Sequence, residues 1–91
     1  MNINVKSFAH LRLALGKSPV LLELPGGSTV SDLLALLGNQ YGEAARTAIW
    51  MKDGQTLKIT PVIDGKVASF QDVIQEGATV VFMSNVAGGL R

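Results

Sequence analysis

The sequence predicts an α+β fold, in which a mixed sheet of about four to five strands is wrapped on one main helix. Three observations support this prediction. Segments compatible with strands stand near both ends of the chain. A longer segment after residue 28 carries apolar side chains at helical spacing. The length of 91 residues allows one small domain with a single core.

Two strand-compatible segments come first. Residues 3–8 alternate between apolar and polar side chains, which is the period of a half-buried strand. Residues 19–24 form the second segment, and Pro19 suits the start of a strand because its missing N–H does no harm there. Between them, residues 9–16 break the alternation and predict either a short helical turn or a loop that ends at Gly16. We therefore expect an N-terminal hairpin.

The main helix is predicted to begin after Thr29. Thr29 and Asp32 have the spacing of a capping box, in which each side chain bonds the backbone N–H of the other residue. Gly38 or Gly42 ends the helix, and residues 43–51 predict a second, shorter helical segment. Apolar residues at helical spacing mark the face that enters the core: Val30, Leu33, Leu34 and Leu37.

The C-terminal half predicts further strands separated by sharp turns. Residues 57–63 have strand character, and Pro61 predicts an edge position or a kink. Residues 78–83 form the last strand. An acidic residue followed by glycine predicts a turn at three places, residues 53–54, 64–65 and 76–77. This order of elements predicts the β-grasp, or ubiquitin-like, architecture. Residues 1–83 would form the domain and residues 84–91 a flexible tail with Gly88 and Gly89.

Composition limits the functions that the chain could have. Hydrophobic residues make up 47% and charged residues 16%, so we expect an exposed apolar patch that contacts a partner. The net charge is +1 without any basic run, which gives no support to nucleic-acid binding. The chain has no cysteine, and its opening does not read as a signal peptide. No segment has the length of a membrane span, so we expect a cytoplasmic protein without a membrane partner.

No pattern of catalytic residues stands out in the sequence. His10 is the only histidine, and we interpret it as a surface or structural residue. The acidic residues are dispersed among caps and turns, and no phosphate-binding loop or metalloprotease motif occurs. We therefore expect a protein that is not an enzyme and that binds no metal or cofactor itself.

Gly88 and Gly89 form the most distinctive feature of the tail. Glycine has no side chain to clash, so such a tail suits insertion into the narrow active-site channel of another protein. A glycine carboxylate is also the least hindered α-carboxylate for activation. Taken alone, the dipeptide is better explained as a frayed end.

Several segments resemble the MoaD/ThiS family of ubiquitin-like sulfur-carrier proteins, in particular the small subunit of molybdopterin synthase. The C-terminal half carries the clearest part of the resemblance, in residues 62–70 (VIDGKVASF) and 76–89 (EGATVVFMSNVAGG). Residues 5–12 (VKSFAHLR) are similar to the first strand and turn of the family, and residues 28–37 (STVSDLLALL) to its helix start. The resemblance covers residues 3–89.

The resemblance implies a mechanism and partners. A ubiquitin-activating-type adenylyltransferase uses ATP and Mg²⁺ to adenylate the carboxylate of Gly89, and sulfur then displaces AMP to form a thiocarboxylate. The tail, with Val86, Ala87 and Gly88 as its slim threading part, enters the large subunit of a synthase and donates the sulfur. In the molybdopterin case the acceptor is a pterin, the precursor of the molybdenum or tungsten cofactor.

The resemblance also implies an apolar docking face on the sheet, at positions that match Phe8, Val67 and Met83, with Phe82 beside them. Phe82 and Met83 are adjacent in a strand, so their side chains point to opposite faces of the sheet. With one main helix to cover the sheet, we expect one of the two to face a partner, and we favour Met83.

Two departures from the family pattern affect these expectations. Ser84 and Asn85 replace a pair of prolines, which weakens the molybdopterin assignment. Leu90 and Arg91 follow Gly89, so Gly89 has no free carboxylate, and we hypothesise a precursor that a metalloprotease cuts after Gly89. The alternatives are a sulfur carrier for thiamine or amino-acid synthesis, a ubiquitin-like modifier conjugated through Gly89, or an interaction domain with an inert tail.

Overall fold

The computed structural model describes residues 1–84, which form five strands and three helices. The order of these elements confirms the predicted α+β fold, and β5 includes Ser84, which the sequence assigned to the tail. In chain order the elements are β1 (Asn2–Ser7), α1 (Ala9–Leu15), β2 (Val20–Glu23), α2 (Val30–Tyr41), α3 (Glu43–Ile49), β3 (Ile59–Ile63), β4 (Lys66–Val67) and β5 (Thr79–Ser84).

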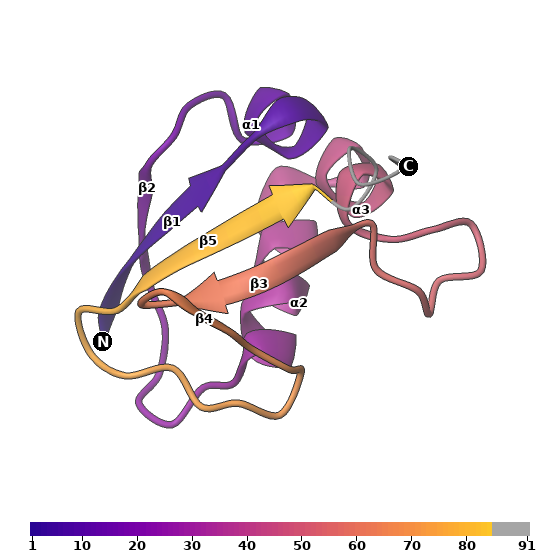
Figure 1. Cartoon of the computed structure of the whole chain (residues 1–91). Helices are drawn as coiled ribbons and strands as arrows, with labels where there is room; N and C mark the ends of the chain where they lie inside the picture. The colour runs from indigo at the N-terminus through magenta and orange to yellow at the C-terminus, as the bar shows by residue number, and fades with distance from the viewer. Residues whose placement is uncertain (85–91) are drawn as a thin grey trace.

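The strands form one mixed sheet in the order β2-β1-β5-β3-β4 (Figure 1). β1 and β5 are parallel neighbours at its centre, with Val5 opposite Val80. The other neighbours are antiparallel, including the predicted N-terminal pair β1 and β2. Parallel neighbours need a long crossover connection. Here the helices and the other strands, which lie between β1 and β5 in the sequence, form that connection. This is the β-grasp architecture, in which the C-terminal strand occupies the middle of the sheet.

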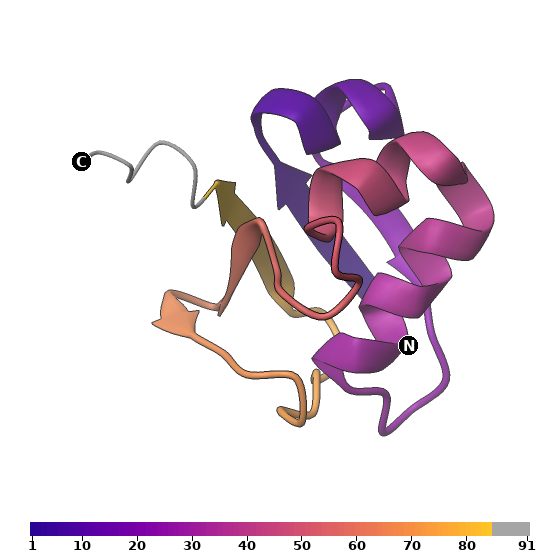
Figure 2. The ribbon, with the colours of Figure 1, turned by 90° about the vertical axis from the view of Figure 1, so that its right-hand side faces the viewer.

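The core lies between the sheet and the helices, which all stand on one side of it (Figure 2). Ile3 and Val5 of β1, Leu33 and Leu37 of α2 and Val80 of β5 have no exposed surface. Burying such a side chain favours folding by about 1.5–3 kcal/mol. The alternation in β1 and the helical spacing in α2 therefore have the same cause, because each directs its apolar side chains into one shared core.

α1 settles the alternative that the sequence left open for residues 9–16. It is a helix of seven residues that buries Leu11 and Leu15. Gly16 ends it with φ 85°, a left-handed conformation that glycine adopts without strain, and its N–H donates to the carbonyl of Arg12. Ala9 starts the helix with φ 53°, which costs an L-residue roughly 1–2 kcal/mol. This sharp turn lets α1 follow β1 with only Phe8 between them.

The predicted capping box starts α2. The Asp32 N–H donates to Thr29 Oγ1 at 3.3 Å, and the Thr29 N–H donates to Asp32 Oδ2 at 2.9 Å. Gly42 ends the helix, whereas Gly38 lies buried within it. A Cβ at Gly38 would approach Arg46 Cγ of α3 to 3.2 Å, so glycine at this position serves close packing of the two helices.

β3 and β4 form a tight hairpin. Asp64 and Gly65 both have positive φ, 47° and 88°, as a two-residue turn between right-handedly twisted strands requires. Pro61 does not lie on the edge strand, because β3 stands between β5 and β4. It is tolerated because the ladder with β4 ends at Val62, and the Pro61 carbonyl accepts from the Ala68 N–H at 2.9 Å. Its nitrogen therefore faces the short edge strand and not β5.

Candidate functional site

The uncovered side of the sheet carries a row of aliphatic side chains across its middle. The strand register places Val62 of β3 opposite both Val81 of β5 and Val67 of β4. Lys6 of β1 continues the row on the other side of Val81. Val67 is 76% exposed, and Val62 and Val81 are half-buried. In a sheet with one solvated face, polar side chains would be expected at these positions.

Two larger apolar side chains lie one step further along the strands. Met83 of β5 is 48% exposed and lies opposite Thr60 of β3. Phe8 is 52% exposed and follows Ser7, whose partner in β5 is Phe82. Since Phe8 still has an extended backbone, the alternation of β1 continues and directs its side chain to the same side as Met83.

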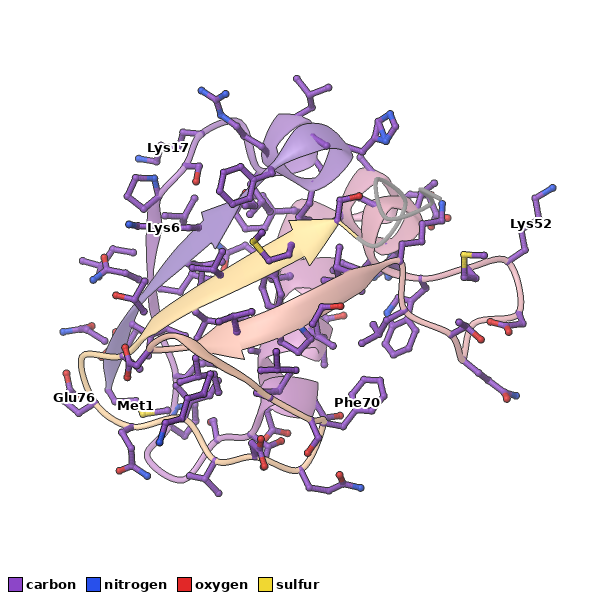
Figure 3. The ribbon with its side chains drawn as sticks, viewed as in Figure 1. Met1, Lys6, Lys17, Lys52, Phe70 and Glu76 are labelled. Atoms are coloured by element: carbon purple, nitrogen blue, oxygen red, sulfur yellow. The ribbon has the colours of Figure 1, made fainter. Side chains whose placement is uncertain are left out.

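These side chains define an outer apolar patch. Figure 3 looks onto this side of the sheet and places the charged residues Lys6, Lys17, Lys52 and Glu76 toward its margin. An exposed group of apolar side chains with charges around it is typical of a surface that binds another protein. The patch consists of Phe8, Val62, Val67, Val81 and Met83.

Phe82 does not belong to this patch. Its side chain is 1% exposed and lies in the core, beneath the sheet. The prediction that Phe82 contacts a partner is therefore wrong, because the alternation of β5 directs it toward the helices and Met83 away from them. The sequence-based preference for Met83 as the exposed member of the pair agrees with the structure.

The described part of the chain stops at the end of β5, beside the outer apolar patch. Ser84 lies opposite Ile59 of β3 and directly follows Met83. The predicted threading residues and the predicted attachment site lie outside the described residues, so these assignments stay predictions: Val86, Ala87, Gly88 and Gly89. The structure nevertheless shows where their segment begins, at the centre of the sheet and at one end of the patch.

Within residues 1–84, no group of three or more histidine, cysteine, aspartate or glutamate side chains is placed to hold a metal ion. None of the helices in this range is long and apolar enough to cross a membrane. His10 is exposed on α1, in line with its interpretation as a surface residue.

The loop before β3 is held together by hydrogen bonds to the carboxylate of Asp53. The N–H groups of Gln55 and Thr56 donate to Asp53 Oδ1 at 2.8 and 2.9 Å, and the Thr56 hydroxyl donates to Oδ2. These hydrogen bonds lower the pKa of Asp53, because they favour the charged carboxylate. Asp53 thereby closes the predicted turn at residues 53–54, and its role is structural.

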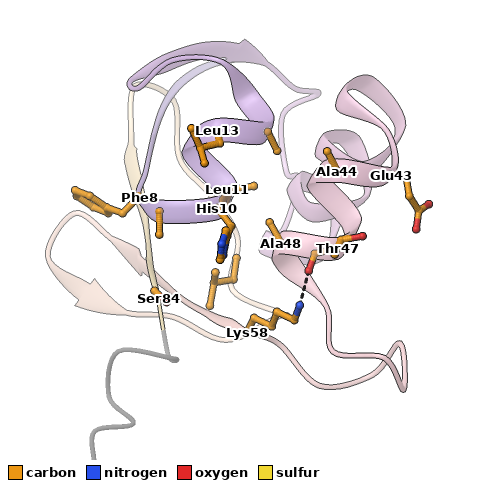
Figure 4. Close-up of a pocket in the computed structure, with 13 residues that line it drawn as sticks. Phe8, His10, Leu11, Leu13, Glu43, Ala44, Thr47, Ala48, Lys58 and Ser84 are labelled. Carbon is orange, nitrogen blue, oxygen red and sulfur yellow. Dashed lines mark hydrogen bonds between the residues drawn. The ribbon is translucent and has the colours of Figure 1, made fainter.

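A groove between α1 and α3 is a feature that sequence reasoning missed (Figure 4). Its volume is about 550 Å³. The signal in the sequence was weak, because residues 9–16 allowed either a helical turn or a loop, and only the helix shows that Leu13 projects outward, 79% exposed. We call it the α1–α3 groove, and its lining includes Leu11, Leu13, Ala44, Ala48, Ile59 and Ser84.

Comparison with known families identifies one match that spans nearly the whole chain. The model of the ThiS family matches residues 5–89. The match therefore includes Gly88 and Gly89 and ends before Leu90. A comparison with curated proteins found no match.

Solved structures with the same fold cover most of the chain. SAMP1 from Haloferax volcanii superposes with a TM-score of 0.79 at 22% identity, covering 92% of this chain and 94% of its own. A putative molybdopterin converting factor subunit 1 from Pyrococcus furiosus has a TM-score of 0.77 at 22% identity, with 92% and 97% covered. Urm1 from Trypanosoma brucei has a TM-score of 0.71 at 22% identity, with 91% and 90% covered. These likenesses show the β-grasp fold.

Proposed function

Because the chain belongs to the ThiS family, we propose that it is a sulfur carrier whose Gly89 carboxylate is converted to a thiocarboxylate. The chain itself is a co-substrate and not a catalyst. It works in the cytoplasm, after a protease has removed Leu90 and Arg91. ATP and Mg²⁺ are used by its activating partner, and the carrier holds no cofactor of its own.

The observation that carries this proposal is the extent of the family match. The match runs through the end of β5 into the Val-Ala-Gly-Gly sequence and ends at Gly89. Leu90 and Arg91 thus lie beyond the family boundary, at the place where a precursor would be cut. The position of β5 supports the same conclusion, because this central strand is held on both sides and leads from the rigid domain to the tail.

The proposed chemistry needs one displacement at the α-phosphorus of ATP and then one at the carbonyl carbon of Gly89. First, a carboxylate oxygen attacks the α-phosphorus of ATP, forming the acyl adenylate and releasing pyrophosphate. Sulfide then attacks the acyl carbon, so that a C–S bond forms as the C–O bond to AMP breaks. When the acceptor later takes the sulfur, water supplies the oxygen that restores the carboxylate. Glycine suits each step because no side chain hinders the carbonyl carbon.

The outer apolar patch is the proposed docking surface for both partners, an adenylyltransferase of the ubiquitin-activating type and the large subunit of a synthase. Met83 and Phe8 are large, apolar and about half exposed, and both residue types are enriched in protein–protein interfaces. They lie beside Ser84, where the tail begins. A partner that covers them would therefore receive the tail directly.

Molybdopterin synthesis is the sulfur-accepting pathway that we propose. The resemblance of the C-terminal half to the small subunit of molybdopterin synthase supports it, as does the likeness to the Pyrococcus furiosus structure, which is named a putative molybdopterin converting factor subunit. Where the family has two prolines, this chain has Ser84 and Asn85. For this reason we keep sulfur delivery to thiamine or amino-acid synthesis as the alternative.

A second candidate function is conjugation to other proteins. It is favoured by the likeness to a Haloferax volcanii structure that is named small archaeal modifier protein 1. In this case the same activated Gly89 would be attacked by a lysine amine instead of sulfide. Lysine-linked conjugates in cells that express the chain would support this function.

A reconstitution experiment tests the carrier proposal. The chain ending at Gly89 is incubated with an adenylyltransferase from the same cells, ATP, Mg²⁺ and sulfide, and its mass is measured. We expect replacement of one carboxylate oxygen by sulfur, and we expect the Gly89→Ala variant to yield none, because its methyl group hinders the channel and the carbonyl carbon. An equal thiocarboxylate yield from both chains would contradict the assignment of Gly89.

A further inference from the structure

The α1–α3 groove has the properties of a binding site for an apolar side chain. Leu13 stands at its mouth and is 79% exposed. Covering this apolar side chain would be favourable, because it would remove apolar surface from water. Opposite it, α3 presents the small residues Ala44 and Ala48, which leave space between the helices (Figure 4). The groove lies away from the outer apolar patch except at Phe8, which borders both.

The groove begins where the described chain ends. Ser84, the last residue that the structure describes, lines it (Figure 4). Leu90 stands six residues further along, which allows a reach of about 20 Å when extended. This reach is comparable with the shortest dimension of the molecule, which is 23 Å. The intervening Gly88 and Gly89 let the backbone turn in directions that other residues avoid.

The charges at the groove define the orientation of such a segment. Glu43 lies at the α3 side, and its side chain is 85% exposed with Arg46 Nη1 at 3.7 Å. Lys58 also lines the groove, and its Nζ donates to the carbonyl of Thr47, likewise in α3, at 2.8 Å. A basic residue that follows the buried side chain is therefore repelled by Lys58 and attracted toward Glu43, whose exposed carboxylate it would share with Arg46.

We propose that the α1–α3 groove binds Leu90 and Arg91 of the same chain, with the Leu90 side chain between Leu13 and Ala48 and the Arg91 guanidinium at Glu43. In the uncut form, Gly88 and Gly89 are held against the domain and kept from a partner's channel. Removal of Leu90 and Arg91 abolishes the contact and releases them. The inference rests on the proposed function, since it describes how the Gly89 site is regulated.

The test compares backbone amide chemical shifts in the full chain and in its Leu90→Glu variant. Burial of a leucine side chain favours the bound state by roughly ten-fold, and the charge of glutamate removes this gain. We expect the amides of Leu13, Ala44 and Thr47 to shift in the variant, although all three are remote from residue 90 in the sequence. Shifts confined to residues that neighbour position 90 would overturn the proposal.

A reciprocal pair of variants examines the groove from its other side. Leu13→Glu should shift the amides of Leu90 and Arg91, while the matched control Leu21→Glu should leave them unchanged. Leu21 is also an exposed leucine, at 65%, but lies on β2 outside the groove. Equal effects of both variants would contradict a specific site. Shifts that disappear on ten-fold dilution would also overturn the proposal, since they would assign the groove to the tail of a second copy.

These measurements include no activating enzyme, so they separate the two proposals. Absence of the remote shifts together with normal thiocarboxylate formation would refute the groove contact alone. Presence of the shifts in a chain that never forms a thiocarboxylate would refute the carrier function alone.

Discussion

At the residue scale, the pair Phe82 and Met83 shows how strand geometry divides core from candidate site. The two residues are adjacent in β5, yet one is 1% and the other 48% exposed. Phe82 adds its ring to the core beneath the sheet, whereas Met83 stands beside Phe8 on the uncovered side. Stability should therefore depend on the first side chain and partner binding on the second.

Truncation of each side chain to alanine should change the free energy of unfolding by very different amounts. Phe82→Ala should lower the free energy of unfolding by about 3–5 kcal/mol, because it leaves a cavity in the core. Met83→Ala should change it by no more than about 0.5 kcal/mol, because the side chain is already half in water. Urea unfolding of the two variants measures both values, and similar losses at the two positions would contradict the burial described for β5.

The sequence established that Phe82 and Met83 face opposite ways, but not which of them faces the helices. Both residues are large and apolar, so alternation alone assigns no side. The choice depends on the register of β5 between β1 and β3, which is a long-range property of the fold. The sequence-based prediction of Phe82 as a partner-binding residue is wrong for this reason, because the register directs its side chain into the core.

At the scale of single elements, the start of α2 depends on the reciprocal bonds between Thr29 and Asp32. Thr29→Ala should lower the free energy of unfolding by about 1 kcal/mol, because one N–H of the first turn loses its acceptor. Ser31→Ala serves as the control, since Ser31 is exposed in the same turn and does not contribute its side chain to the capping box. Thermal unfolding measures the difference, and equal midpoints for the two variants would argue against a stabilising cap.

Local patterns predicted most elements because their causes are local. The alternation of β1, the capping box of α2 and the turn at residues 64–65 each depend on residues close in sequence. α1 could not be assigned in this way, because residues 9–16 are too few to distinguish a helical turn from a loop, and tertiary packing of Leu11 and Leu15 selects the helix. Gly38 was ambiguous for a similar reason, since its role is contact with Arg46 of another helix.

At the scale of the whole molecule, the fold brings residues from β1, β3, β4 and β5 together into the outer apolar patch, next to the start of the tail. The family resemblance indicated Phe8, Val67 and Met83, while Val62 and Val81 become part of the patch only through the strand register. The α1–α3 groove likewise depends on how two helices pack, so no single segment could have indicated it.

Docking through the patch predicts a position-specific loss of binding. Met83→Glu should weaken binding to the activating adenylyltransferase by at least about ten-fold, or ~1.4 kcal/mol, because a charge would be buried against an apolar partner surface. Val73→Glu is the matched control, because Val73 is 49% exposed in the loop that borders the start of α2. Titration calorimetry measures both affinities, and equal binding by the two variants would exclude the patch as the docking surface.

The central claim concerns Gly89, and the intact mass of the chain purified from its native cells tests it most directly. The account predicts a chain that ends at Gly89 and carries sulfur in place of one carboxylate oxygen, which would demonstrate cleavage and sulfur carriage together. A chain that keeps Leu90 and Arg91 under every growth condition would contradict the account, because Gly89 would then have no carboxylate to activate.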